Sequence, residues 1–447
     1  MRSSTRTLDW PNQPLPFKIY TSLAPMPLSL TFDVSSPPTG EIDLNSVARL
    51  AYFSNGVTRV LHGVAFRAAA CTGALFHIEV YCVAGDRDEL EAGVYHYGAH
   101  DNALRQLRRG DFRQVLIDAS GQEPRVAGAP LTLVLTSTWW RNAWKYEARA
   151  YRHAFWDAGT LLANLLSVAD GQGLPARLIV GFADSPVNQL LDVDPDQEAA
   201  IALVAIGRDA APPRDSPPTP PLNLPTRPLS AHQVAYPQIT AAHAASSLPD
   251  GAAAAGWRAR FPVRREARRP ITDEPVEAVI LRRGSSRRFS QAAITLDGLR
   301  TLLARATCAF DCDAFVACDL YLIVNAVDDL QPGAYAYSRD TRTLELLKPG
   351  DHRPMATYLD LGQPLAGDAA FNAYWLVNLD VLDNRGYRAA QLSAAIEAGQ
   401  LYLAAYGLGL GATGLTFFDD DVTRFFEPHA SGKSVMFLTA VGHPFRR

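Results

Sequence analysis

The sequence lacks any apolar run that approaches the roughly 20 residues needed to cross a bilayer. Its first residues, MRSSTRTLDWPNQPLPF, contain no apolar stretch of the kind found in a secretory signal, so we expect a cytoplasmic protein with no membrane role. An excess of one charge is also missing, because the formal net charge is only -4. This balance argues against nucleic acid or an anionic membrane as the main partner.

Cysteine is scarce, with five residues in the chain. An odd number without a signal peptide predicts reduced thiols rather than a disulfide framework. Cys308, Cys312 and Cys318 are close in sequence but lack paired CxxC units, so we expect no zinc site there and no other metal site. HExxH and GxGxxG motifs in the right context are absent too, which argues against a zinc hydrolase and a Rossmann NAD site.

What is present is a chain of 447 residues, 48% hydrophobic and 20% charged, which is long enough for two or three globular domains. The clearest boundary is the segment 211–228, in which eight of 18 residues are proline. Proline removes backbone donors and favours an extended, semi-rigid chain. We therefore predict an N-terminal domain over residues 1–208, a proline-rich linker over 209–230 and a C-terminal domain over 231–447.

The two halves resemble each other at an offset of 240 residues. The segment 88–111 aligns without a gap with 328–351, and nine of the 24 positions are identical. Each copy follows an alternating apolar run (HIEVYCV or DLYLIV) that predicts a strand, and GVYHY and GAYAY predict a second one. The segments 150–166 and 386–409 both show helical spacing of apolar residues. This order predicts an α+β fold duplicated by fusion, a pseudo-dimer within one chain.

The segment LRRGSSRRFS (281–290) places several arginines around the hydroxyls of Ser285 and Ser286. Guanidinium groups and hydroxyls match phosphate oxygens in charge and geometry. The alternative is a solvated basic loop before a helix that starts near Thr295. The region of the first half where an equivalent would lie, SVARLAYFSNGVTRV, does not have the pattern.

A second candidate is the glycine-rich segment 407–421, GLGLGATGLTFFDDD. Glycine permits close approach of the backbone to a ligand. The alternative is that Gly407 and Gly409 simply end the preceding helix.

Arg283, Ser285, Arg287 and Phe289 match, position by position, a motif that resembles the flavin-phosphate motif of the nitroreductase family, Arg-x-Ser-x-Arg/Lys-x-Phe. The resemblance implies an FMN-dependent oxidoreductase in which Arg283, Ser285 and Arg287 hold the phosphate and ribityl chain.

The glycine-rich segment stands where this family has the loop that meets the isoalloxazine ring. The resemblance therefore implies that Leu415, Thr416 and Phe417 contact FMN, with backbone amides near Thr416 and Phe417 facing N5 and O4 of the ring.

The first half contributes RAAACTGALFHIEVY (67–81), which resembles the family segment that enters a strand and packs over the flavin. The resemblance implies that Cys71, Thr72 and Gly73 contact FMN, although Cys71 and His77 stand where the family has proline. The corresponding second-half segment, CAFDCDAFVACDLYLI, has lost the pattern. Each half thus keeps what the other lacks, which predicts one composite flavin site per chain.

Tandem halves of this kind, with the segment LDWPNQPLPFKIY (8–20), resemble the SagB-type dehydrogenases, which include azoline dehydrogenases of modified peptides. That branch carries a Lys-Tyr pair, matched here by Lys145 and Tyr146, which the resemblance implies are catalytic. Azoline oxidation removes a proton from one ring carbon and a hydride from the next. A lysine can take such a proton only if burial lowers its pKa, and a phenol can relay it.

The resemblance also implies a peptide-derived substrate, possible cyclodehydratase partner subunits and reoxidation by dioxygen. Two rivals stay open: an NAD(P)H-driven nitroreductase or quinone reductase, and a degenerate, non-catalytic peptide-binding or scaffold subunit. We expect a histidine among His77, His96 and His153 to be structural more often than functional. Trp139, Trp140 and Trp144 could line a substrate pocket or belong to the core.

Overall fold

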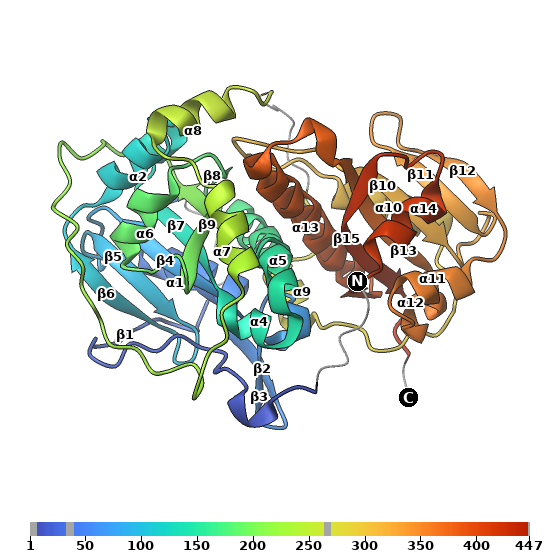
Figure 1. The fold of residues 1–447 in the computed structure, drawn as a ribbon, viewed down its shortest axis with the longest axis horizontal. Helices are drawn as coiled ribbons and strands as arrows, with labels where there is room; N and C mark the ends of the chain where they lie inside the picture. The colour runs from blue at the N-terminus through green and yellow to red at the C-terminus, as the bar shows by residue number, and fades with distance from the viewer. Residues whose placement is uncertain (1–6, 33–39, 263–269, 446–447) are drawn as a thin grey trace. The chain divides into compact units, whose positions relative to one another are not determined.

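The computed structural model describes residues 7–32, 40–262 and 270–445 (Figure 1). They form two compact units. The N-terminal unit comprises residues 7–262 together with 310–315, and the C-terminal unit comprises 270–309 and 316–445. The units thus divide after the proline-rich segment and not within it, so that residues 231–262 belong with the N-terminal half. Residues 1–6 lie outside the described residues. They begin the segment that we predict is not a secretory signal.

The N-terminal unit is built on a seven-stranded antiparallel sheet in the order β1-β6-β5-β4-β7-β9-β8, and a separate hairpin pairs β2 with β3. Its strands are β1 (Met26–Pro27), β2 (Val57–Leu61), β3 (Val64–Arg67), β4 (Ile78–Ala84), β5 (Gly93–Gly98), β6 (Ala103–Arg109), β7 (Leu131–Thr138), β8 (Ala176–Ile179) and β9 (Glu198–Ile206). Its helices are α1 (Leu44–Asn55), α2 (Arg113–Ala119), α3 (Pro124–Ala127), α4 (Trp139–Tyr146), α5 (Ala150–Gly171), α6 (Asp184–Leu191), α7 (Pro237–Ala245) and α8 (Gly251–Arg258).

The C-terminal unit has a six-stranded antiparallel sheet in the order β12-β11-β10-β13-β15-β14. Its strands are β10 (Asp319–Val324), β11 (Gly333–Ser338), β12 (Thr343–Pro349), β13 (Phe371–Asn378), β14 (Gly411–Gly414) and β15 (Lys433–Gly442). Its helices are α9 (Val276–Arg282), α10 (Leu296–Ala306), α11 (Arg353–Leu359), α12 (Pro364–Asp368), α13 (Asn384–Gly407) and α14 (Asp419–Phe426).

Six strands follow the same order in the two sheets, as the predicted duplication requires. The offset of 240 residues relates β5 to β11, β6 to β12, β7 to β13 and α2 to α11. The sequence analysis anticipated fewer strands per half, because β6 carries three arginines that hide its alternation, and β8 and β14 have only four residues each. β14 also lies inside the segment 407–421, which was expected to be a loop throughout.

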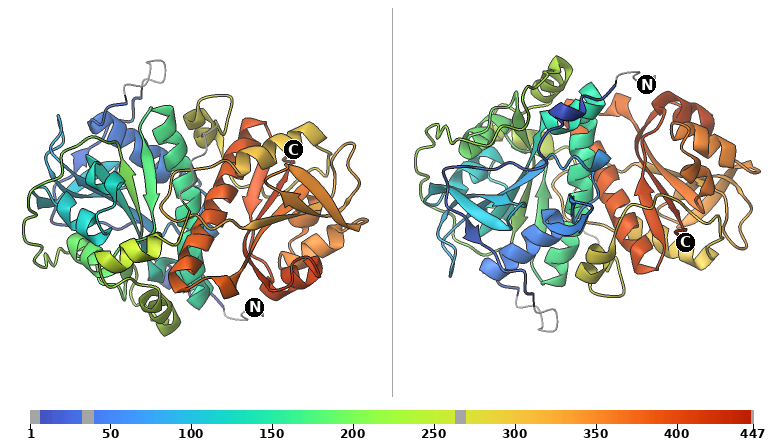
Figure 2. Two further views of the ribbon diagram at one scale, coloured as in Figure 1. Left: turned by 90° about the horizontal axis from the view of Figure 1, so that it is seen from above. Right: turned by 90° about the horizontal axis from the view of Figure 1, so that it is seen from below.

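Each long helix covers one face of the sheet in its own unit, α5 in the first and α13 in the second (Figure 2). All but three residues of α5 are buried, because apolar residues recur around the helix and not on one stripe alone. The hydroxyl of Thr295 caps α10 by accepting from the backbone amide of Gly298, as the sequence predicted for a helix beginning there. None of the described helices combines the length and apolarity that a membrane span needs.

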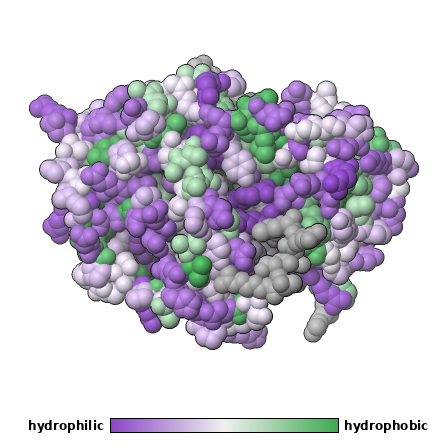
Figure 3. All heavy atoms as spheres, in the orientation of Figure 1, coloured by the Kyte–Doolittle hydropathy of each residue, from purple (hydrophilic) through white to green (hydrophobic). Residues whose placement is uncertain are grey.

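The end of the proline-rich segment runs over the N-terminal unit beside residues 15–21. The Tyr20 backbone bridges to Thr226, the Arg227 amide donates to the Ile19 carbonyl, and the Leu15 amide donates to the Leu229 carbonyl. We call these paired stretches, residues 8–21 and 225–236, the strap. On the face seen in Figure 3, hydrophilic residues predominate and apolar ones are scattered among them.

Residues 310–315 extend the core of the N-terminal unit, although they belong to the second half of the sequence. Asp313 accepts hydrogen bonds from the amides of Val180 and Gly181, at 2.8 and 2.9 Å, and Asp311 pairs with Arg177. Within the described ranges, Cys308, Cys312 and Cys318 form no cluster that could hold a metal ion.

Candidate functional site

In the N-terminal unit, the loop that leads from β3 into β4 is fixed by a polar stripe on α5. Thr160 donates to the Ala70 carbonyl at 2.7 Å, and Asn164 donates to the Ala68 carbonyl at 3.1 Å. Asp157 accepts from the Thr72 amide at 2.9 Å. The spacing of these helix residues keeps them on one face of α5, and they hold alternate residues of the loop.

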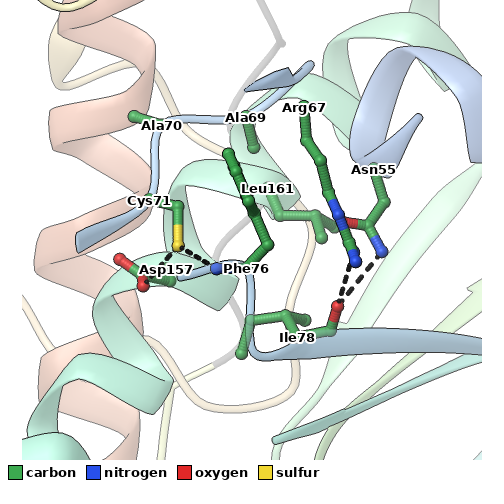
Figure 4. A pocket seen from close by; sticks show the side chains of 9 residues that line it. All are labelled: Asn55, Arg67, Ala69, Ala70, Cys71, Phe76, Ile78, Asp157 and Leu161. Carbon is green, nitrogen blue, oxygen red and sulfur yellow. Dashed lines mark hydrogen bonds between the residues drawn. The ribbon is translucent and has the colours of Figure 1, made fainter. Parts of the chain in front are cut away.

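We call these contacts between α5 and the loop the clamp, and Asp157 is at its centre. Its carboxylate also accepts from the Thr72 hydroxyl at 2.7 Å and from the Cys71 thiol at 3.1 Å, and it lies 2.7 Å from His77 Nε2. Burial and then the Asp157 carboxylate raise the pKa of Cys71 well above its usual value, which keeps the thiol protonated. Figure 4 shows this thiol between Asp157 and the Phe76 amide, beside a cavity of about 10 Å³.

Cys71, His77 and Asp157 form the one group of possible metal ligands in the described part of the chain. Their ligand atoms already bond to one another, and His77 Nδ1 lies 2.9 Å from the Ser137 hydroxyl. These hydrogen bonds hold the loop in place, and we therefore assign His77 a structural role.

The Lys-Tyr pair lies in the last turn of α4. The Tyr146 hydroxyl lies directly over Gly73, 2.9 Å from the point that a β-carbon on Gly73 would occupy. Gly73 has a φ of 68°, which a residue with a side chain rarely adopts. The unit thus brings Gly73 into contact with Tyr146, and both are candidate site residues from the sequence analysis.

Lys145 is exposed, and its Nζ lies 5.2 Å from the centroid of the Tyr146 ring. The burial that a lysine needs to act as a base is therefore not provided by the N-terminal unit's own residues.

A hydrogen-bonded bridge ties α4 to the same loop and to α5. Asn142 donates through Nδ2 to the Thr72 carbonyl at 3.4 Å, and its Oδ1 lies 2.7 Å from His153 Nδ1. This orientation of the amide makes His153 Nδ1 the donor and leaves Nε2 as a buried acceptor, which has no partner among the described residues. Burial, and then the cation of Arg149, lower the pKa of His153 well below its usual value.

α4 is anchored at several further points. Arg141 donates to the Phe76 carbonyl at 3.1 Å and pairs with the buried Glu79. Trp140 Nε1 donates to the Ser230 hydroxyl, and Trp144 Nε1 donates to the Asp9 carbonyl, both in the strap. Trp139, Trp140 and Trp144 are all buried, so they are core residues and not the lining of an open pocket.

In the C-terminal unit, the arginine-serine segment 281–290 follows α9. The Arg283 guanidinium lies 5.9 Å from the centroid of the Tyr402 ring, and the Ser285 hydroxyl bonds to the Tyr402 phenol. The same phenol accepts from the Gly414 amide. Burial raises the pKa of Tyr402, so it stays a neutral phenol. Tyr402 therefore links the segment to β14.

The segment forms a cradle suited to a phosphate. Arg287 is exposed, and the buried Ser286 hydroxyl has no hydrogen-bond partner among the described residues. The neighbouring Arg288 stacks on Phe445 instead. A β-carbon on Gly411 would lie 2.1 Å from the Ser286 hydroxyl, so a side chain there would force this hydroxyl to turn away. The exposed Arg287 cation and the unsatisfied Ser286 hydroxyl are groups that a phosphate would satisfy.

The segment 415–417 lies beside this cradle. Leu415 packs against the cluster formed by Phe289, Ala369 and Ala440, and Phe417 is fully buried. The Leu415 amide donates to the Leu438 carbonyl and the Phe418 amide to the Leu359 carbonyl. The buried Phe417 side chain thus anchors the segment 415–417 in the core of the C-terminal unit.

The N-terminal unit has a different chemistry at the equivalent corner of its sheet, where β8 begins and β9 ends. The groove there is lined by five acids and two arginines, together with other residues: Glu41, Asp43, Asp86, Asp88 and Asp209, with Arg87 and Arg208. Gly207 follows β9 as Gly442 ends β15, so the topology makes the two corners counterparts. Acids would repel a phosphate, so this groove does not suit one.

Sequence reasoning missed Asp157, Asn142 and Tyr402. Asp157 and His153 are four residues apart in a predicted helix, and this spacing was the available signal for a polar stripe. Tyr402 lies in an otherwise apolar stretch of α13, and nothing in the sequence distinguishes it from a core tyrosine.

Comparison with known proteins bears on the family and the fold of both halves. Residues 54–208 and 280–443 each match the family described as Nitroreductase family. A solved structure of a protein from Anabaena variabilis, named as a nitroreductase, superposes with a TM-score of 0.81 at 26% sequence identity and covers 99% of this chain and 96% of its own.

Two curated relatives match one part of the chain each. A Methanocaldococcus jannaschii protein named as a nitroreductase is 24% identical over 174 residues, which is 39% of this chain and 83% of the relative. The Microcin B17-processing protein McbC of Escherichia coli is 29% identical over 140 residues, which is 30% of this chain and 52% of McbC. The chain thus matches about half the length of McbC.

Proposed function

Because the chain belongs to the nitroreductase family, in two tandem segments, we propose that it is an FMN-dependent dehydrogenase of the SagB type. It oxidises an azoline, or a related heterocycle, in a peptide-derived natural product. The observation that carries this proposal is the contact between Tyr146, of the Lys-Tyr pair, and Gly73, of the loop that resembles the flavin-covering loop. The likeness to a protein named for microcin processing supports a peptide substrate.

The arginine-serine cradle is the proposed grip on the FMN phosphate. Arg283 and Arg287 supply charge, Ser285 and Ser286 supply hydroxyl donors, and Gly411 leaves room for them. We expect Cys71, Thr72, Gly73 and the segment 415–417 to contact the ring system. When bound, FMN would supply a two-electron acceptor. The acidic counterpart groove and the missing motif in the first half support one FMN per chain.

Lys145 and Tyr146 are the proposed proton-handling groups. Oxidation of an azoline to an azole releases one proton and one hydride equivalent from adjacent ring carbons. Lys145 would take the proton, and the Tyr146 phenol, held over Gly73, would orient the ring or relay the proton. Lys145 is exposed in its unit, so the base role requires that bound ligand desolvate its amine.

The experiment is a comparison on the purified protein reconstituted with FMN. A short synthetic peptide with a single thiazoline is incubated with it in air, and thiazole formation is followed by mass spectrometry as a loss of two hydrogens. We expect turnover without NAD(P)H, loss of turnover in Lys145→Ala and Tyr146→Phe, and one FMN per chain.

Two results would replace the proposal by its rivals. A flavin that is bleached by NADPH, with turnover that survives Lys145→Ala, would indicate a nitroreductase or quinone reductase. A protein that stays colourless with added FMN would indicate a non-catalytic peptide-binding or scaffold subunit. A pull-down with purified cyclodehydratase subunits tests the remaining expectation about partners.

A further inference from the structure

Glu147 joins α4 to the 3₁₀ turn that leads into α5, and its backbone has φ 52° and ψ -138°. These angles are close to those of the first central residue of a type II′ turn, a position dominated by glycine. A residue with a β-carbon is strained there. Glu147 directly follows the Lys-Tyr pair, so the strained residue sets the direction in which the chain leaves Tyr146.

The strain persists because the structure fixes the chain on both sides of Glu147. Its own amide donates to the Ala143 carbonyl and so completes the last turn of α4. α4 is held by Arg141 on the Phe76 carbonyl and by Trp144 on the Asp9 carbonyl. α5 is held by Asp157 on the loop. Neither helix can shift to relax the residue between them.

A second set of unfavourable backbone angles lies on the other side of the contact between Tyr146 and Gly73. In the turn beneath Tyr146, φ is 68° at Gly73, 53° at Ala74 and 45° at Phe76. Two of these three residues carry side chains. Residues with such angles persist where the surrounding structure over-determines them, and they gather at ligand clamps and active sites.

We propose that Glu147 is a positioning residue, whose strained backbone confines Tyr146, and with it the preceding Lys145, at the Gly73 turn. The expected effect on catalysis rests on the proposed function, whereas the strained backbone geometry does not. The role belongs to the backbone of residue 147 and not to its carboxylate. A glycine has a broad, unstrained minimum at these angles and neighbouring ones. A glycine at residue 147 would therefore relax the backbone and let the Lys-Tyr pair move away from the Gly73 turn.

The test compares Glu147→Gly with Glu147→Ala in the full chain. The alanine variant removes the carboxylate and keeps the strain, so it is the matched control. Relative to Glu147→Ala, we expect Glu147→Gly to raise the melting temperature by about 2–5 °C. Hydrogen exchange at residues 72–76 and 145–149 should nevertheless become faster. With the thiazoline peptide, kcat of Glu147→Gly should fall at least about tenfold while KM changes less than about twofold.

Opposite changes in global stability and local protection distinguish positioning from a merely structural role. A glycine variant that melts at or below the alanine variant overturns the claim of strain. A glycine variant with the wild-type exchange pattern overturns the claim of positioning, and so does one with undiminished kcat. If the wild type does not oxidise the peptide at all, the proposed function fails, and the melting and exchange measurements still decide the inference about Glu147.

Discussion

The Tyr146 hydroxyl lies 2.9 Å from the point that a β-carbon on Gly73 would occupy, which is closer than real β-carbons approach another atom. Tyr146, of the Lys-Tyr pair, is therefore in direct contact with Gly73 within the N-terminal unit. A side chain added at Gly73 must displace the Tyr146 phenol.

The first prediction concerns this contact. Gly73→Ala should push the Tyr146 phenol aside and impose a side chain on a residue with φ 68°. We expect a loss of about 1–2 kcal/mol in unfolding free energy, because alanine is disfavoured at positive φ. Turnover of the thiazoline peptide should fall at least about tenfold. Gly63→Ala is the matched control, since Gly63 has φ 78° and nothing near its β-carbon position. Equal turnover losses in both variants would contradict the contact.

The second prediction concerns the clamp on the loop. Asp157→Asn should lower the unfolding free energy by about 2–4 kcal/mol, because the amide places a donor where the Thr72 amide and hydroxyl also donate. Chemical denaturation of this variant measures the loss. Asp196→Asn, an exposed aspartate in the same unit, should be neutral. If Asp157→Asn were as stable as Asp196→Asn, the clamp would not hold the loop.

The third prediction is a pH dependence. Burial keeps the pKa of His153 well below its usual value of about 6.5, so the folded protein holds it neutral while the unfolded chain protonates it. The unfolded state then binds more protons, and stability falls as pH drops below about 6.5, by up to about 1.4 kcal/mol per pH unit. His153→Asn keeps a group that can reach Asn142 but does not titrate. Unfolding at pH 7.5 and 5.5 should show a smaller decrease for this variant; an equal decrease would assign the effect to other groups.

The fourth prediction concerns the proposed phosphate cradle. Arg287→Ala should weaken FMN binding about 10–100-fold, because it removes a charged donor to the phosphate. Arg288→Ala is the control, since its guanidinium stacks on Phe445 at 4.6 Å from the ring centroid. Flavin fluorescence titrations of the two variants make the comparison. The assignment of Arg287 fails if the two variants bind FMN equally well.

The sequence by itself determined the duplication, because strand residues recur at a constant offset and the strand period leaves them little freedom to differ. It also determined which half keeps the arginine-serine cradle, since that motif is local: Arg283, Ser285 and Arg287 lie within five residues. The start of α10 near Thr295 could be predicted from the sequence for the same reason. Such features depend on neighbours along the chain.

Only the tertiary structure decided the rest, because those features depend on residues far apart in sequence. Asp157 holds Thr72 across 85 residues, and Tyr146 reaches Gly73 across a similar distance. The proline-rich segment was read as a linker from its composition, yet its carbonyls and amides pair with residues 15–20, so it belongs to the N-terminal unit. Composition shows that such a segment cannot form a helix, but partners for its backbone groups come only from the fold.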